Sequence, residues 1–482
     1  MSFKKLLSYL ILIVMIATIT PFTAHAKTDQ YDTIKKNGVL RVGLSADYAP
    51  YEFEKTVNGK REYAGIDIEL SKKLAKDLGV ELKIVNMQFD SLLGALKTGK
   101  IDVIISGMSP TPERKKEVDF SDYYMHVQQR MIIQKKDAKK LKSIEDFKGK
   151  NIGVQKQTTQ EELAKTEIPD ANVTSLTRVP EIIMSLNTGK IDGVVLEGPV
   201  GEAYLSQNTN LAFSDMQFAD ENKGTAIALP KDSPKLLDAL NKTIKEVEDK
   251  GLMKGYKDKA NEAMFDEGSF FSKYGSFFIQ GIGATILISL IGVVLGSIFG
   301  GILAFMKLSK NIILKTLSWI YIEFIRGTPL LVQVFLVYFG TTAVLGIDLS
   351  AFICGAIALV INCAAYIAEI IRAGINAVDK GQTEAARSLG LSHAQTMNKV
   401  VMPQAIKNIL PALGNEFVTV IKESSIVSVI GVSELMFNAQ VVQGASFDPF
   451  TPLLIAAVVY FILTFALSRL MNVFERRMRV SD

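Results

Sequence analysis

The pattern of apolar and polar residues divides the chain into two unlike parts. Between residues 27 and 266, short apolar segments alternate with polar ones. Residues 39–44 have the composition of a buried strand, and the apolar side chains of residues 66–78 recur at helical spacing until Gly79. This alternation predicts an α/β domain with a parallel sheet. The apolar segments beyond residue 276 are longer and predict an all-α transmembrane domain at 277–482.

The long apolar segments of the second part are each sufficient to cross a hydrocarbon layer of roughly 30 Å. They cover residues 277–305, 314–345, 351–371, 402–432 and 451–470. Basic residues gather after the first, third and fifth segments, which predicts that these ends lie in the cytosol. We therefore expect a multi-pass protein of the cell membrane with five spans, a cytoplasmic C-terminus and an extracellular α/β domain.

The N-terminus has the features of an export signal. Lys4 and Lys5 precede the apolar residues 6–19, and Ala24-His25-Ala26 has the small-x-small pattern of a cleavage site. We expect a signal peptide at 1–26; an uncleaved anchor helix is the alternative. In either case, the following domain at 27–266 is delivered outside the cytosol.

A short motif that occurs twice predicts two lobes in the α/β domain. Leu-x-Thr-Gly-Lys-Ile-Asp occupies residues 96–102 and 186–192, and an apolar strand follows each copy. We expect one lobe at about 37–127 and 224–262 and the other at about 131–215. A short flexible linker at 267–276 is expected to join this domain to the membrane.

Ligands bind beyond the carboxyl ends of strands in open parallel sheets, so the residues after the two repeated strands are candidates for a binding site. Ser109 and Arg114 follow the first strand, and Glu197 follows the second. A guanidinium on one lobe and a carboxylate on the other suit a ligand with both an α-carboxylate and an α-ammonium. The alternative is that Arg114 and Glu197 are ordinary surface charges.

Five further segments favour the binding-site interpretation over that of ordinary surface charges. Residues 43–53, Gly65-Ile-Asp67, Gly99-Lys-Ile-Asp102, Glu113-Arg114 and 119–123 occur in order, and together they resemble the polar-amino-acid binding proteins of two-lobed clamshell fold. The resemblance implies that Arg114 holds the α-carboxylate and Glu197 the α-ammonium. It assigns supporting contacts to Ser109, Gly107, Tyr48, Phe89, Thr158 and Thr159.

Three positions depart from the pattern of that family. Ser45 stands where relatives that hold cationic side chains have Asp, Gln157 replaces the usual Gly, and Glu197 replaces the usual Asp. The missing Asp disfavours arginine and lysine, so glutamine is the expected ligand. A basic amino acid is the alternative, because Asp47, Glu52 or Gln160 could supply other polar partners.

The polar segment Gly381-Gln-Thr-Glu-Ala-Ala-Arg-Ser-Leu-Gly-Leu-Ser392 resembles the loop by which permeases of ABC importers bind their ATPase. The resemblance extends over most of the last two hundred residues and implies a type I permease, closest in layout to glutamine importer permeases. It implies a cytoplasmic coupling loop at 380–392, in which Glu384, Ala385, Ala386 and Gly390 match the family.

Several charged residues fall inside or beside the apolar segments, where burial in lipid is costly. They are Arg326, Glu369, Glu416, Lys422 and Glu423. We expect them to face the bundle interior and to line a translocation path, or else to pair with one another. Pro329, Pro403 and Pro411 are expected to break helices nearby.

The chain contains no phosphate-binding Gly-x4-Gly-Lys-Ser/Thr sequence, so we expect no ATPase or other enzyme activity. The permease resemblance implies a separate dimeric ATPase subunit that holds ATP-Mg, and a second copy of this chain. No metal or cofactor is expected on the chain itself. The net charge of +4 does not favour nucleic acid. An amino-acid-gated receptor or channel, or a wall-cleaving enzyme, are the remaining alternatives.

Overall fold

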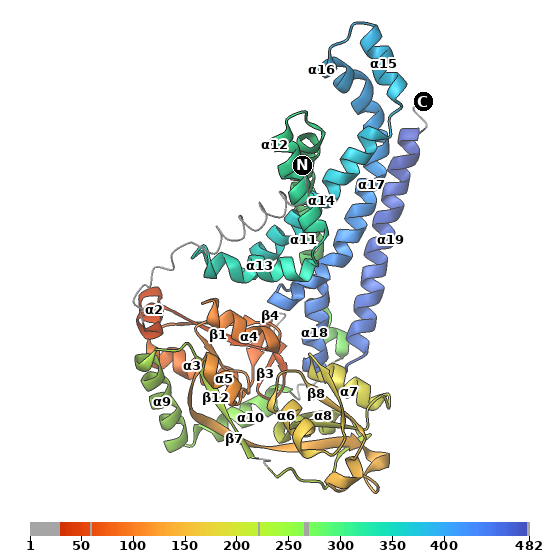
Figure 1. The fold of residues 1–482 in the computed structure, drawn as a ribbon. Helices are drawn as coiled ribbons and strands as arrows, with labels where there is room; N and C mark the ends of the chain where they lie inside the picture. The colour runs from red at the N-terminus through yellow and green to blue at the C-terminus, as the bar shows by residue number, and fades with distance from the viewer. Residues whose placement is uncertain (1–28, 58–59, 220–221, 265–268, 480–482) are drawn as a thin grey trace.

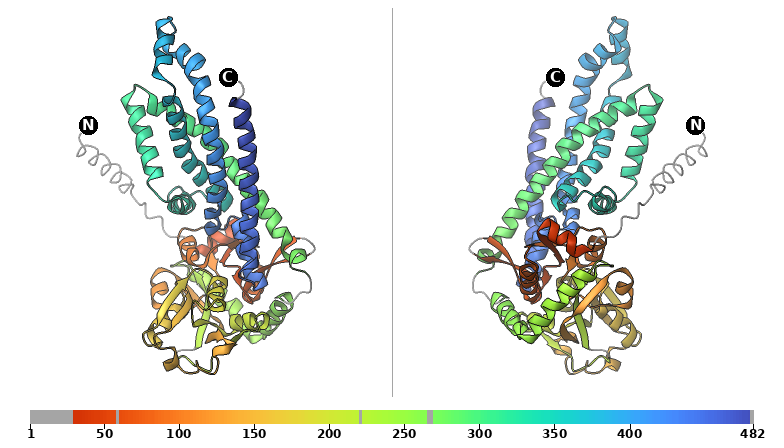
Figure 2. Two further views of the ribbon diagram at one scale, coloured as in Figure 1. Left: turned by 90° about the vertical axis from the view of Figure 1, so that its right-hand side faces the viewer. Right: turned by 90° about the vertical axis from the view of Figure 1, so that its left-hand side faces the viewer.

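The computed structural model describes residues 29–57, 60–219, 222–264 and 269–479. The expected signal peptide lies outside these residues. An α/β domain forms one end of the molecule and a bundle of long helices stands on it, an arrangement that two perpendicular views also show (Figures 1 and 2). The predicted combination of a two-lobed α/β domain and an all-α membrane domain is confirmed.

The α/β domain is built on one mixed sheet with a small second sheet beside it. The strand order of the large sheet is β5-β1-β6-β12-β7-β10-β8-β9, with β11 paired to β7, and β2-β3-β4 form the small sheet. The strands are β1 Val39–Leu44, β2 Asp47–Tyr48, β3 Glu52–Val57, β4 Lys60–Ala64, β5 Glu81–Asn86, β6 Val103–Ile104, β7 Asp119–Gln134, β8 Asn151–Gln155, β9 Asn172–Leu176, β10 Gly193–Glu197, β11 Leu211–Phe213 and β12 Asn222–Leu229.

The helices of this domain cover the faces of the sheet (Figure 1). They are α2 Gln30–Asn37, α3 Ile66–Leu78, α4 Leu92–Lys97, α5 Pro112–Glu117, α6 Thr159–Glu167, α7 Val179–Asn187, α8 Gly198–Gln207, α9 Pro234–Asp249 and α10 Leu252–Met264. We call the part around β1, β5, β6, β12 and the small sheet lobe 1, and the part around β8, β9, β10 and β11 lobe 2. Strand β7 pairs with β12 of lobe 1 and then with β10 and β11 of lobe 2, so it crosses between them.

The repeated motif has the same structure in both lobes. Its glycines adopt left-handed φ values of 75° at Gly99 and 73° at Gly189, which side chains rarely tolerate. The Asp102 carboxylate accepts a 2.7 Å hydrogen bond from the backbone N–H of Arg41, and the Asp192 carboxylate accepts one of 2.9 Å from that of Asn151. Each aspartate thereby fixes the start of a neighbouring strand.

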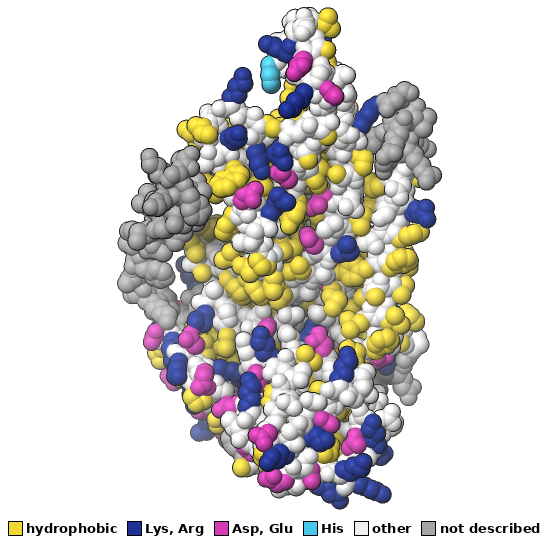
Figure 3. Space-filling model, turned by 45° about the vertical axis from the view of Figure 1, so that its right-hand side comes forward, with side chains coloured by type: hydrophobic (Ala, Val, Ile, Leu, Met, Phe, Trp, Pro, Cys, Tyr) yellow, Lys and Arg dark blue, Asp and Glu magenta, His cyan; other side chains and the backbone are white. Residues whose placement is uncertain are grey.

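The helical part contains α11 Phe270–Leu308, α12 Ile312–Arg326, α13 Leu330–Ala343, α14 Ala351–Asn376, α15 Lys380–Ser388, α16 His393–Thr396, α17 Met402–Glu423, α18 Leu435–Ser446 and α19 Thr451–Arg479. Among the described residues, α11, α14 and α19 are long and apolar enough to cross a membrane, and the number rises to five if each of two bent helix pairs is one span. Figure 3 shows hydrophobic side chains concentrated on this bundle, between charged ends.

Two expectations about helix continuity need correction. The segment 314–345 is two helices at 106°, because Pro329 begins a new helix after Gly327. Pro411, in contrast, lies inside α17 and does not end it, and Pro403 lies in the first turn of that helix. Proline is tolerated in the first turn, where its missing N–H would have no partner in the helix.

The expected flexible linker at 267–276 also needs correction. Residues 265–268 lie outside the described part, but α11 already begins at Phe270, where Ser269 caps the helix by accepting a hydrogen bond from Ser272 N–H. Most of the predicted linker is therefore the first two turns of a long helix. The α/β domain also packs directly on the bundle: Met87, Leu92 and Leu96 of lobe 1 share one apolar core with Leu330 and Tyr338 of α13.

Candidate functional site

A polar pocket lies between the two lobes, with about 350 Å³ of space not filled by protein atoms, part of it open to solvent. All nine residues that the sequence predicted for ligand binding line it, together with four others. The predicted residues are Ser45, Tyr48, Phe89, Gly107, Ser109, Arg114, Thr158, Thr159 and Glu197; the others are Asp47, Ser106, Gln155 and Gln160.

Arg114 is a buried cation in this pocket. It lies in α5, where Thr111 caps the helix and Pro112 starts it. Its guanidinium donates 2.6 Å hydrogen bonds to the backbone oxygens of Ser109 in lobe 1 and Gln157 in lobe 2, and the Phe89 ring lies 5.5 Å away. Among the described residues it has no ion pair. Burial lowers the pKa of Arg114 to about 10, so it stays charged at neutral pH and provides an unneutralised positive charge.

Glu197 is the complementary group on lobe 2. It ends β10 and is 1% exposed, and its Oε2 has no hydrogen-bond partner in the described part of the chain. Burial raises the pKa of Glu197 to about 8. A carboxyl group held in this way is stabilised as an anion when a cation enters the pocket.

The remaining lobe 1 residues shape the wall of the pocket. Gly107 has a φ of 53°, and a Cβ there would lie 3.1 Å from the Tyr48 ring and 3.9 Å from Glu197 Oε2. The left-handed φ favours glycine here, and a side chain would also be tight against the Tyr48 ring. The Ser109 hydroxyl is buried without a hydrogen-bond partner among the described residues. The Tyr48 ring stacks on Tyr51 with centroids 5.4 Å apart.

The lobe 2 wall is the turn before α6. Thr158 caps this helix by accepting from Glu161 N–H, and its own hydroxyl donates a 2.6 Å hydrogen bond to Gln155 O. Thr159 is buried beside it. Gln157 has a φ of 63°, a left-handed conformation that explains why glycine is usual at this position.

The sequence did not predict that Asp47 forms an ion pair with Arg178. Asp47 accepts a 2.8 Å hydrogen bond from the Ser45 hydroxyl and pairs with Arg178 at 2.7 Å. Asp47 belongs to lobe 1 and Arg178 to lobe 2, so the pair joins the lobes. No local signal marks Arg178, because its partner is 131 positions away in the sequence.

A buried carboxyl pair lies behind the pocket and was also missed. Glu52 and Asp67 are both 0% exposed. Ser106 donates to Glu52, while Gly107 N–H and the Tyr124 hydroxyl donate to Asp67 at 2.8 and 2.9 Å. Burial raises the pKa of Asp67 to about 6 and that of Glu52 well above its usual value. The negative charge near Glu197 is therefore reduced at neutral pH.

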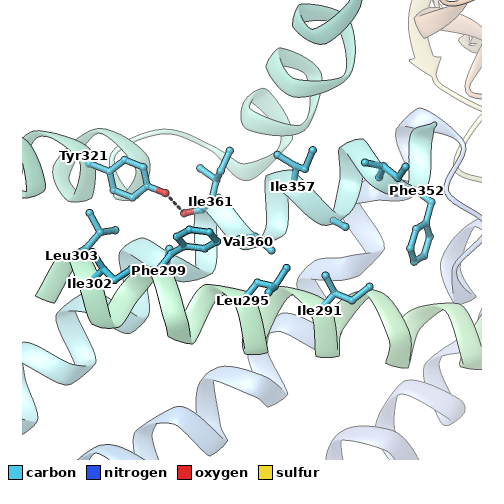
Figure 4. A pocket seen from close by; sticks show the side chains of 13 residues that line it. Ile291, Leu295, Phe299, Ile302, Leu303, Tyr321, Phe352, Ile357, Val360 and Ile361 are labelled. Carbon is cyan, nitrogen blue, oxygen red and sulfur yellow. Dashed lines mark hydrogen bonds between the residues drawn. The ribbon is translucent and has the colours of Figure 1, made fainter. Parts of the chain in front are cut away.

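A second cavity, with about 1200 Å³ of space not filled by protein atoms, lies between α11, α12 and α14 (Figure 4). Its walls are aliphatic and aromatic side chains, and the Tyr321 hydroxyl already donates a 2.9 Å hydrogen bond to Ile361 O. Nothing in these walls complements a charged ligand, whereas the pocket between the lobes offers a cation and an ionisable carboxyl group.

The charged residues of the membrane part behave differently from one another. Glu369 pairs with Arg372 on its own helix and with Lys307 of α11 at 3.0 Å, and neither partner is one of the residues that were expected to pair with one another. Arg326 lies 5.5 Å from the Tyr366 ring and is exposed, as is Lys422. Glu416 and Glu423 are half-buried on α17.

The segment predicted to bind an ATPase lies at the end of the molecule farthest from the α/β domain (Figure 1). It forms α15 and α16, joined through Gly390, which has a φ of 84°. Ala386 is buried, while Glu384, Ala385 and Leu389 are exposed, Leu389 by 83%. This end therefore presents an accessible helical hairpin.

Comparisons with known proteins agree with this division. Residues 40–262 match the bacterial extracellular solute-binding proteins, family 3, and residues 292–480 match the binding-protein-dependent transport system inner membrane component.

Within the described residues, no three His, Cys, Asp or Glu side chains cluster as metal ligands would.

Three relatives illustrate the two halves. A putative glutamine transport system permease protein of Rickettsia conorii is 43% identical over 205 residues, 42% of this chain and 94% of the relative. The arginine transport system permease protein of Bacillus subtilis is 40% identical over 209 residues, 43% of this chain and 94% of the relative. The arginine-binding extracellular protein of the same species is 40% identical over 223 residues, 46% of this chain and 85% of the relative. The chain thus belongs to the inner membrane components of binding-protein-dependent transport systems, with a family 3 solute-binding domain fused before the permease domain.

Proposed function

We propose that this chain imports a polar amino acid, glutamine in preference to others, across the cell membrane. One observation carries the proposal: Arg114 and Glu197, buried and without ion-pair partners in the described structure, face one pocket from opposite lobes. The α-carboxylate of an amino acid pairs with the Arg114 cation, and its α-ammonium pairs with Glu197 and favours ionisation of that carboxyl group, so its binding joins the lobes. The pairing of solute-binding and permease families in one chain supports import rather than a receptor or channel.

Transport requires an energy source that this chain does not supply. A cytosolic ATPase dimer with ATP-Mg would bind the hairpin of α15 and α16, and a second copy of this chain would complete the permease about a twofold axis. The hairpin and the binding domain lie at opposite ends of the bundle, which supports an extracellular domain and a cytoplasmic hairpin. The last helix, α19, ends near the hairpin, which supports a cytoplasmic C-terminus.

The preference for glutamine rests on which cation pairs with each carboxyl group of the pocket. Glu197 is required by the α-ammonium, and Asp47 is already neutralised by Arg178. The other polar groups at the wall, among them Gln155 and Gln160, are uncharged. A neutral amide side chain suits them better than a cation, because an unpaired buried charge is costly.

Arginine is the second candidate, because the relative that matches the binding half is named an arginine-binding protein. Calorimetry on the full chain in lipid nanodiscs would compare glutamine, arginine, lysine and histidine. Tighter binding of glutamine supports the first candidate and tighter binding of arginine the second. If no amino acid binds, the proposed function is wrong.

The coupling role is tested by Glu384→Lys. We expect this variant to bind ligand normally, but to lose uptake and ligand-stimulated ATP hydrolysis in vesicles with the ATPase partner, because a cation replaces an exposed carboxylate on the hairpin. Glu145→Lys, an equal charge change on the surface of lobe 2, is the control and should transport normally. Normal uptake by Glu384→Lys would refute the assignment of the hairpin.

A further inference from the structure

Helix α18 of the permease domain contacts both lobes of the binding domain. Arg61 of lobe 1 donates a hydrogen bond to the Asn438 side chain of α18. On the other side, Phe447, directly after α18, packs edge-on against Tyr204 of lobe 2, with ring centroids 5.1 Å apart. The permease therefore contacts the binding domain where both lobes are accessible to one helix (Figure 1).

Arg178 lies at the centre of this junction. It precedes α7 in lobe 2 and pairs with Asp47 of lobe 1 at 2.7 Å. The same guanidinium donates hydrogen bonds of 2.8 and 2.9 Å to the side-chain and backbone oxygens of Gln440 in α18. All three side chains are buried, with exposed fractions of 5 to 6%. One side chain thus contacts lobe 1 and the permease from lobe 2.

The backbone of α18 approaches Asp47 closely beside this contact. A Cβ at Gly444, one turn after Gln440, would lie 2.6 Å from the Asp47 Cα. Since such a distance is prohibitive, only glycine permits the observed packing. The position of α18 is therefore fitted to Asp47 and Arg178 together.

The chemistry of this junction depends on whether the lobes are together. Gln440 offers only neutral oxygens to Arg178, and burial of a guanidinium with neutral partners alone is unfavourable. Glu181, half-buried on α7 of the same lobe, also lies near Arg178, but no ion pair between the two is found in the described structure. Asp47 supplies the paired negative charge, and it lies on the other lobe. When the lobes separate, the ion pair is lost, and α18 would have to bury an unpaired cation. Docking on α18 is therefore favourable only with the lobes closed.

We propose that Arg178 is the positioning residue through which the permease detects lobe closure, because it can bind Gln440 in a buried site only when Asp47 is paired with it. This inference rests on the proposed function, in which ligand closes the lobes. The junction is linked to the ligand pocket, since Ser45 and Asp47, joined by a hydrogen bond, both line that pocket.

A gain-of-function variant tests the proposal. Gln440→Glu gives α18 its own negative charge, so Arg178 no longer needs Asp47 to be buried there. In nanodiscs with the ATPase partner, we expect at least a threefold rise in ligand-free ATP hydrolysis relative to wild type. Addition of Arg178→Gln should abolish the rise. A merely structural role for Gln440 predicts loss of activity instead, so an unchanged or lower ligand-free rate would overturn the proposal.

A second variant keeps the test decisive if Gln440→Glu does not fold. Arg178→Gln alone should lower the maximal rate of ATP hydrolysis at saturating ligand at least tenfold. Arg130→Gln is the matched control: it is an arginine of lobe 2 whose guanidinium lies over the Phe213 ring, 4.3 Å from its centroid, and it should retain full stimulation. Stimulation of Arg178→Gln equal to wild type would overturn the proposal.

These outcomes are distinguishable from failure of the proposed function. If no amino acid stimulates the wild-type complex, import itself is wrong. If wild type is stimulated and the Arg178 and Gln440 variants behave like it, only the detection of closure is wrong.

Discussion

Two regions of the binding domain each contain a buried arginine, and the two arginines differ in their partners. Arg114, in the ligand pocket, has backbone oxygens and an aromatic ring around it but no carboxylate among the described residues. Arg178, at the junction with α18, has a carboxylate from the opposite lobe and oxygens from the permease. The first charge needs a ligand for neutralisation, whereas the second is neutralised by the protein itself. The comparison shows which of the two buried charges the protein leaves without an ion pair in the described structure.

The largest effect is expected for Arg114→Ala. Removal of the guanidinium leaves the α-carboxylate of the ligand desolvated and unpaired, which costs roughly 2 to 5 kcal/mol, or about thirtyfold to several thousandfold in affinity. Calorimetry on the full chain would measure this loss, with Arg130→Ala as the control. An unchanged affinity would show that Arg114 does not hold the ligand, and the contrast between the two arginines would disappear.

The next effect concerns Glu197. The pKa of Glu197 is raised to about 8, so without ligand the folded protein binds a proton that the unfolded chain releases near pH 4.5. Its contribution to stability is therefore greatest at low pH and falls as the pH rises from about 4.5 to 8. Glu197→Gln should flatten this part of the profile, measured by ligand-free thermal unfolding, although Asp67 and Glu52 still titrate.

The same variant should weaken ligand binding by about 1.5 to 3 kcal/mol, because a charge-assisted hydrogen bond to the ammonium is lost. In the wild-type chain, binding should release a proton below pH 8, seen as a dependence of the calorimetric enthalpy on the buffer. The absence of such proton release would contradict the pairing of Glu197 with a cation.

A smaller effect is expected for Ser45→Asp. The new carboxylate would lie beside Asp47 and, unlike Asp47, would have no arginine to neutralise it. We expect the ratio of arginine to glutamine affinity to rise about tenfold, equivalent to roughly 1.4 kcal/mol. Ser45→Asn is the uncharged control. An unchanged ratio would mean that an unpaired carboxylate at the pocket does not determine which ligand side chain is preferred.

The smallest effect is expected for Gln157→Gly. Gln157 holds a left-handed φ of 63° while its backbone oxygen accepts from Arg114. Glycine relieves that strain but loses more chain entropy on folding, so the net gain in unfolding free energy is about 0.5 kcal/mol. Chemical denaturation would measure it, and destabilisation would contradict the strain argument.

Much of the ligand pocket was predictable because its residues follow local rules. The repeated motif places two strands whose carboxyl ends meet at one cleft: Glu197 ends β10, and Ser109 and Arg114 lie in the loop and the short helix α5 that follow β6. Thr158, which the resemblance assigned to the ligand, caps α6. The roles of Gly107, Tyr48, Phe89 and Thr159 also came from the resemblance, and the structure places these residues at the pocket.

The sequence by itself determined the two-part architecture and the repeated strand motif, because periodicity, glycine conformation and capping act over a few residues. Most candidate pocket residues and the hairpin segment came from the resemblance to known families. Only the tertiary structure decided that Arg178 neutralises Asp47, that Gln440 of the permease joins them, and that the chain turns by 106° between α12 and α13. Arg178 and Gln440 are separated by 262 positions, and no local pattern encodes a contact that forms only when two domains pack. The charge on the cleft wall at Asp47 depends on those distant contacts.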